Sequence, residues 1–163
     1  MVTFRCPKVT CSLDTAALCK EVLNETLPEE PDLVCLIAPG NNLSNNTIQQ
    51  AGKEFASLIP SAQGTWNKVV VIDFPNRLTV EFPYQDMLRQ EYHRVAASMN
   101  VRYLSAVDHF PARSSDLWCR DGVHLSDGML IFAQLIWCAA YFQLNVPQGI
   151  KTTLLHPDVH SAE

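Results

Sequence analysis

The stretch Lys68-Val69-Val70-Val71-Ile72-Asp73-Phe74 (KVVVIDF) is the segment that decides the fold class. It is a continuous run of apolar, mostly β-branched residues, without the alternation expected of a half-exposed strand. Such a run predicts a strand that is covered on both faces, as the strands of parallel sheets are. Pro75-Asn76 follows it and predicts the end of the strand.

Strand-like and helix-like segments alternate on both sides of this strand. Residues 33–38 (LVCLIA) predict a second buried strand, which ends at Pro39-Gly40-Asn41-Asn42. Between the two strands, apolar residues at helical spacing predict a helix that Asn46 or Thr47 caps and Pro60 ends. The other predicted segments are a short strand at 2–6, helices at 13–23 and 84–99, a strand at 101–105, a loop to Arg120, and a helix from Ser126 or Asp127 to about Leu144.

Strands that alternate with helices imply a parallel sheet with helices packed against it. The predicted fold class is therefore α/β, a three-layer α/β/α sandwich with a parallel sheet. We expect one α/β domain over residues 1–146 and a loose tail over residues 147–163. In such sheets the chemistry gathers beyond the carboxyl ends of the strands. This places the loop at 39–42 and the long loop before the last helix as the candidate site.

Composition and charge narrow the class of protein. The 163 residues are 47% hydrophobic and 18% charged, which is typical of a globular chain. The net charge of -5 and the scattered 12 Lys and Arg residues give no electrostatic basis for binding nucleic acid. The apolar run Met129–Phe142 is too short to span a bilayer, so no membrane span is predicted.

The cysteines and the glycosylation-type sequons bear on where in the cell the protein is expected. The six cysteines form neither a CxxC pair nor a zinc spacing, and Cys35 and Cys138 lie in apolar runs, which predicts that both are core residues. The start of the chain lacks a secretory signal, and free thiols favour a reducing compartment, so we expect a cytoplasmic protein. Glycosylation-type sequons begin at Asn24, Asn42 and Asn45, and we interpret them as chance matches.

Asp121-Gly122-Val123-His124 is the candidate catalytic motif. A carboxylate three positions before a histidine, in a turn with glycine, can reach the ring, accept the Nδ1 hydrogen and leave Nε2 free to take a proton. Two interpretations stay open at this point. Asp121 orients a general base, or it only bonds backbone amides while His124 packs ahead of the helix.

Asn41 is the second candidate. A side-chain amide just past a buried strand can donate to a developing oxyanion, and Gly40 lets a ligand approach the backbone closely. The alternative is ordinary turn chemistry, for which Asn-rich loops are common. Arg77, after the strand at 68–74, is either a contact for an anionic substrate or a solvated loop residue. Phe110 and Trp118 either line an acyl pocket or pack in the core.

These motifs resemble those of the SGNH (GDSL-type) hydrolases, a superfamily of esterases, lipases and deacetylases with a flavodoxin-like sheet. The family's third block is a strand followed by Gly-x-Asn-Asp or Gly-x-Asn-Asn. Residues 31–42 (PDLVCLIAPGNN) match it in register, with Pro39 in place of the glycine. The fifth block, Asp-x-x-His before the last helix, matches residues 121–126 (DGVHLS). The resemblance covers roughly residues 5–143.

The first block, Gly-Asp-Ser, carries the family's nucleophile and does not occur in this sequence, and the glycine of the second block is also missing from Cys6–Thr10. The resemblance therefore implies a domain that lacks its first strand–helix unit. The residues that could replace the nucleophile are Cys11, Ser12, Ser44 and Ser126, of which Ser126 is better interpreted as a helix cap, and none lies on a strained turn that would present it.

The resemblance implies a hydrolase of small acyl or acetyl esters that needs no metal or organic cofactor. His124 would be the base, Asp121 its orienter and Asn41 an oxyanion donor. Because no nucleophile is recognisable, we expect the 163-residue chain to be inactive as it stands, as a truncated product or a pseudoenzyme. The alternative is a non-catalytic binding or assembly module on the same scaffold, a kind of domain that also occurs in mobile-element proteins.

Overall fold

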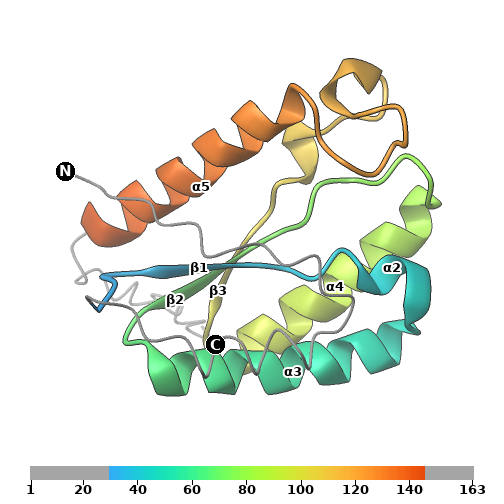
Figure 1. Ribbon diagram of the computed structural model, residues 1–163. Coiled ribbons are helices and arrows are strands. Elements are labelled where there is room, and N and C mark those ends of the chain that lie inside the picture. Colours follow the sequence, from blue (N-terminus) through green and yellow to red (C-terminus); the bar gives the residue numbers. More distant parts are fainter. Residues whose placement is uncertain (1–29, 146–163) are drawn as a thin grey trace, which may run out of the picture.

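The computed structural model of the chain describes residues 30–145 (Figure 1). The predicted strand at 2–6, the helix at 13–23 and the tail at 147–163 lie outside the described residues. The elements, in chain order, are β1 (Val34–Ile37), α2 (Asn42–Asn45), α3 (Ile48–Thr65), β2 (Val69–Ile72), α4 (Phe82–Ser98), β3 (Arg102–Leu104), the 3-10 turns η1 (Val107–His109) and η2 (Ser115–Leu117), and α5 (Gly128–Asn145).

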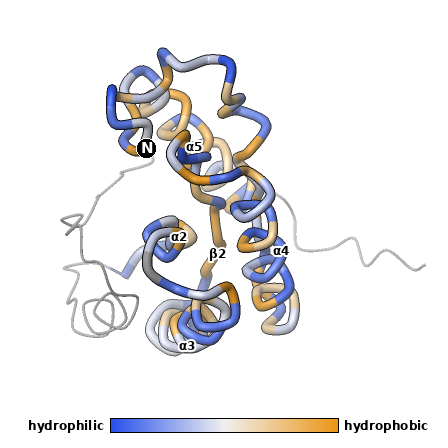
Figure 2. The backbone as a smooth tube through the Cα atoms, turned by 90° about the vertical axis from the view of Figure 1, so that its right-hand side faces the viewer, coloured by the Kyte–Doolittle hydropathy of each residue, from blue (hydrophilic) through white to orange (hydrophobic). Residues whose placement is uncertain are grey.

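The three described strands form one parallel sheet in the order β1-β2-β3, in which Val34 is paired with Val69 and Val70 with Arg102. Helices α3 and α4 lie on one side of this sheet and α5 on the other (Figures 1 and 2). The strand–helix alternation that the sequence predicted is therefore confirmed, and the described part is an α/β fold with a three-stranded parallel sheet.

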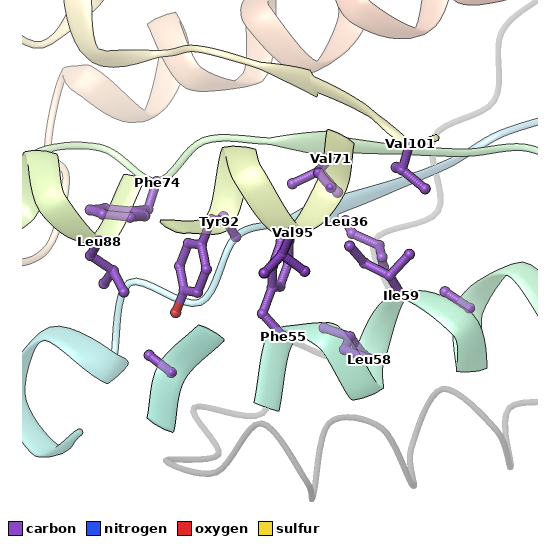
Figure 3. Packing of buried hydrophobic residues seen from close by; sticks show 14 of the residues in the cluster. Leu36, Phe55, Leu58, Ile59, Val71, Phe74, Leu88, Tyr92, Val95 and Val101 are labelled. Atoms are coloured by element: carbon purple, nitrogen blue, oxygen red, sulfur yellow. The ribbon is translucent and has the colours of Figure 1, made fainter. Parts of the chain in front are cut away.

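Two apolar clusters fill the space on the two sides of the sheet. Phe55, Leu58 and Tyr92 belong to the cluster between the sheet and the α3–α4 pair (Figure 3). Phe110 and Trp118 belong to the other cluster, together with Phe132 of α5. Because Phe110 and Trp118 are both buried, they are core residues rather than the lining of an open acyl pocket.

Helix α3 differs from the sequence prediction at its end. Thr47 caps it, as expected, because its hydroxyl accepts a hydrogen bond from the Gln50 N–H at 3.2 Å. The helix nevertheless continues through Pro60 to Thr65. A proline inside a helix removes one backbone hydrogen bond. The apolar face beyond it, with Ala62 fully buried and Trp66 at the end, compensates by packing in the core.

Helix α4 buries Leu88, Tyr92 and Val95, three apolar residues at helical spacing. Met87 of the same helix is 56% exposed. The buried face also includes the polar residues Gln85 and Arg89. Polar side chains occupy this face because they bond to the ends of β2 and the following loop.

Helix α5 leaves much of its apolar surface uncovered. Phe132 and Ala140 are buried, whereas Leu130 is 68% exposed. Trp137 and Tyr141 are also exposed and stack on each other, with ring centroids 5.4 Å apart. Cys138 was predicted to be a core residue and is exposed, because it lies on the face turned away from the sheet. Within residues 30–145, α5 alone is long and apolar enough to cross a membrane by length and composition, which by itself is weak support for a span.

Candidate active site

Asp121 and His124 are brought together by the turn that precedes α5. The Asp121 Oδ2 atom lies 2.6 Å from His124 Nδ1. The other carboxylate oxygen, Oδ1, accepts the backbone N–H groups of Val123 at 2.9 Å and His124 at 3.0 Å. One carboxylate thus both closes the turn and holds the imidazole. Both kinds of contact that the sequence left open, to the backbone amides and to the imidazole ring, are therefore present.

These contacts set the electrostatics of the pair. The hydrogen bonds from the His124 ring and from the Val123 and His124 backbone hold the pKa of Asp121 well below its usual range. The carboxylate is therefore ionised at neutral pH and favours a proton on Nδ1. The His124 side chain is 71% exposed, and no group in the described part of the chain bonds to its Nε2 atom.

The turn itself is anchored to the loop after β2. Gly122 has a φ of +65°, a conformation that residues with a Cβ rarely adopt. Its carbonyl accepts the Leu78 N–H at 2.8 Å, and an added Cβ would lie 3.0 Å from the Leu78 Cβ. On the other side of the turn, the Ser126 hydroxyl donates to the Asp116 carbonyl at 2.6 Å. Ser126 was predicted to cap the last helix, and its hydroxyl makes this loop contact instead.

Asn41 lies just past β1, at the start of the short helix α2, and is half-buried. Its Oδ1 atom accepts a hydrogen bond from the Arg77 guanidinium. This fixes the orientation of the amide, so that Nδ2, the donor an oxyanion needs, points away from Arg77. Gly40 before it packs against Phe74, and an added Cβ would lie 3.2 Å from the Phe74 Cβ.

The neighbouring Asn42 has a structural position. It is buried, and its Nδ2 donates to the Tyr92 hydroxyl at 2.9 Å. That hydroxyl in turn donates to the Pro39 carbonyl at 3.1 Å. Tyr92 of α4 therefore holds the chain on both sides of Gly40-Asn41. No local pattern predicts this contact, because the two partners are 50 residues apart.

Arg77 connects the two candidate sites. It is half-buried, and besides Asn41 it contacts the Ser44 hydroxyl at 3.3 Å. Gln85, fully buried on α4, fixes its backbone by accepting the Arg77 N–H at 2.9 Å and donating to the Arg77 carbonyl at 2.8 Å. The next residue, Leu78, bonds to Gly122. Asn41 is thus linked to the Asp121–His124 turn through two adjacent loop residues.

This linkage places both candidates at one edge of the sheet. Figure 1 shows α2, the loop after β2 and the loop before α5 at the same end of the molecule, beyond the carboxyl ends of the strands. Among the described residues, Asn41 makes no hydrogen bond with the Asp121–His124 pair. The loop at 77–78 lies between them.

A buried polar network supports the carboxyl end of β2 and the loop that follows it. Arg89 bonds through Nε to Asp73 Oδ2 at 2.9 Å and through a terminal nitrogen to Asn76 Oδ1 at 2.7 Å. Burial raises the pKa of Asp73, while Arg89 and the Tyr103 hydroxyl oppose that rise. The backbone carbonyl of Asn76 in turn accepts the Trp118 Nε1–H at 2.8 Å. The network therefore ties the end of β2 to the loop that carries the Asp121 turn.

In the described residues no group of three or more His, Cys, Asp or Glu side chains is arranged to hold a metal ion. A shallow surface hollow lies directly after the His124 turn and is lined by Ser126, Asp127, Met129, Leu130 and Ala133.

Several solved structures are similar to this chain in fold. The chain is similar to the lipase/acylhydrolase from Enterococcus faecalis with a TM-score of 0.65 and 17% identity over 84% of this chain and 74% of that one. It is similar to a protein from Parabacteroides merdae assigned to the GDSL-like lipases (TM-score 0.60, 14% identity, 78% and 67% covered). It is also similar to a catalytic mutant of the acetylxylan esterase Axe2 from Geobacillus stearothermophilus (TM-score 0.52, 13% identity, 80% and 66% covered).

At these identities the similarity is one of fold. The chain has the α/β scaffold on which these acylhydrolases, GDSL-like lipases and esterases are built. No protein-family model matches the chain, and no curated protein matches its sequence.

Proposed function

We propose that this chain is an SGNH-type ester hydrolase domain that retains the base, its orienting carboxylate and an oxyanion donor. The observation that carries the proposal is the 2.6 Å contact between Asp121 Oδ2 and His124 Nδ1, in a turn whose imidazole is open to solvent. The hydrolase scaffold of the similar structures supports it. The complete domain that we propose is a three-layer sandwich with a flavodoxin-like sheet.

The chemistry of the pair follows from its geometry. With Nδ1–H donated to Asp121, the neutral ring carries its lone pair on Nε2, the atom that can take a proton from an attacking hydroxyl. The ionised carboxylate then stabilises the imidazolium that forms. General-base assistance of this kind typically contributes a factor of about 10²–10⁴ in rate.

Asn41 would stabilise the negative charge that develops on the ester oxygen. Since Arg77 holds its Oδ1, the Nδ2 donor is already oriented before a substrate binds. One such donor is typically worth about 2.7–4 kcal/mol in the transition state. Arg77 is thus proposed as the residue that positions Asn41.

The nucleophile is the part that the sequence does not supply. We infer little or no esterase activity for the 163-residue chain, because it has no Gly-Asp-Ser block and no described hydroxyl bonds to His124 Nε2. Ser126 is engaged with the Asp116 carbonyl and Ser44 with Arg77. The same observations favour the second candidate function, a non-catalytic module that binds an ester or acylated ligand on this scaffold.

The tautomer of His124 tests the proposal directly. Long-range ¹H–¹⁵N correlation spectra above pH 8 should show the His124 proton on Nδ1. In the Asp121→Asn variant the carboxylate that selects this tautomer is gone, and the proton should shift toward Nε2. Exposed His93, which has no carboxylate partner among the described residues, provides an internal control. An Nε2–H tautomer in the unmodified chain would refute the assignment of His124 as a base.

Hydrolysis of p-nitrophenyl acetate tests the inferred inactivity. The unmodified chain and His124→Ala should both hydrolyse this ester at close to the rate of buffer alone. Robust turnover that disappears in His124→Ala would show that a nucleophile is present and would overturn the inference. Binding of an unhydrolysed ester in the absence of turnover would favour the binding-module alternative.

A further inference from the structure

Arg77 differs from the other arginines whose contacts the structure describes. Arg89 is buried and paired with Asp73 at 2.9 Å, and Arg94 is exposed and paired with Glu91 at 2.7 Å. Arg77 is half-buried, and its side-chain partners, Asn41 Oδ1 and Ser44 Oγ, are both neutral oxygens. Within residues 30–145 it forms no ion pair.

This leaves a positive charge without compensation at a place where water is partly excluded. Burying a charge without a partner of opposite sign costs free energy. Burial indeed lowers the pKa of the Arg77 guanidinium, and no neighbouring carboxylate opposes that shift. Asp121, whose turn bonds to the neighbouring Leu78 through Gly122, is engaged with the His124 ring.

The guanidinium also has donors to spare. It carries five N–H groups, and two of them are used by Asn41 and Ser44. The remaining donors have no acceptor among the described residues. A planar fork of free donors that carries a full charge suits carboxylate and phosphate oxygens.

We propose that Arg77 binds an anionic oxygen group, a carboxylate or a phosphate, of a ligand that lies beside Asn41 at the carboxyl ends of the strands. The ligand class is then an ester or acylated compound that carries a negative charge close to its ester or acyl group, the group that Asn41 would contact. The proposal rests on the proposed function only for that ester group. The anion site itself requires neither a nucleophile nor turnover.

Titration with inorganic phosphate at constant ionic strength, adjusted with sodium chloride, tests the site on the whole chain. The Arg77 Nε–Hε signal in ¹H–¹⁵N spectra should move and saturate at millimolar phosphate. The signal of Arg102, an exposed arginine at the amino end of β3 and so at the opposite end of the parallel strands, should not move. A parallel titration with sodium acetate distinguishes the two ligands, since the tighter of the two anions identifies the group.

Matched variants complete the test. Arg77→Gln should weaken binding of the preferred anion by about tenfold or more, because charge-assisted hydrogen bonds are lost. Arg102→Gln makes the same change in net charge and should bind as the unmodified chain does. Equal shifts at both arginines, shifts that never saturate, or an unchanged affinity in Arg77→Gln would overturn the proposal. The titration of the unmodified chain decides the question even if Arg77→Gln does not fold. Phosphate binding at Arg77 in a chain without a functional His124 base would leave this site standing while the hydrolase proposal fails.

Discussion

Removing the hydroxyl of Tyr92 should loosen the loop that carries Asn41 without disturbing the core. The Tyr92 ring is fully buried and packs against Phe55, with ring centroids 4.5 Å apart, and a phenylalanine would keep that packing. The Tyr92→Phe change deletes two hydrogen bonds, one with Asn42 and one with the Pro39 carbonyl. Burial raises the pKa of Tyr92, so its hydroxyl stays protonated and the bond to Pro39 persists at neutral and mildly alkaline pH.

The expected loss follows from these two bonds. Each buried hydrogen bond contributes roughly 0.5–1.5 kcal/mol net, and a carbonyl left without its partner adds to the cost, so Tyr92→Phe should destabilise the fold by about 2–3 kcal/mol. For a chain of this size that corresponds to a fall in Tm of roughly 5–10 °C.

Urea unfolding followed by circular dichroism measures the change, provided that the m-value is unaltered. Tyr84→Phe is the matched control on the same helix. The Tyr84 hydroxyl makes one bond, to the Asn46 carbonyl at 3.0 Å, and is half-exposed, so its loss should cost about 0.5 kcal/mol. In Tyr92→Phe the amides of residues 40–42 should also exchange faster with solvent. A Tyr92→Phe variant as stable as Tyr84→Phe would refute this reasoning.

Three further predictions concern the turn, the last helix and pH. Gly122→Ala should destabilise the protein by about 1–2 kcal/mol because of the positive φ and the Leu78 contact. Gly64→Ala, in a helix with open space around it, should stabilise the protein by about 0.5–1 kcal/mol. Urea unfolding of both variants measures the two changes. Phe132→Ala should cost about 3–5 kcal/mol, while Trp137→Ala on the exposed face of α5 should change thermal stability little; equal losses would mean that the outer face is covered. The Asp121 carboxyl has a pKa below its unfolded value of about 3.9, so the stabilisation it provides is present above that value and is lost as the pH falls through the lower folded pKa. Carboxyl ¹³C spectra at pH 4 should therefore show Asp121 still ionised, and a half-protonated signal would contradict the contact with His124.

Much of the fold could be predicted because its signals are local. The apolar runs before Pro39 and Pro75 predicted two strands of the parallel sheet, and helical spacing together with Thr47 predicted the start of α3. The prediction that Pro60 ends α3 was wrong. The loss of one backbone hydrogen bond at Pro60 is local, whereas the packing against the core that compensates for it is not. The prediction that Cys138 lies in the core was wrong for a related reason. Hydrophobicity does not say which face of a uniformly apolar helix will be covered.

The candidate site also contains one contact that is local in the sequence and others that are not. Asp121 and His124 are three residues apart, so turn geometry alone brings them into contact, and the sequence by itself determined that pairing. The positions of Asn41 and Arg77 were decided by the tertiary structure, since 36 residues separate the two side chains. They meet only because parallel strands end at a common edge and because α4 docks with Gln85 against the loop after β2. Contacts over short separations are fixed by backbone dihedrals, whereas contacts over long separations form only when the packing of the whole core selects one arrangement of the layers.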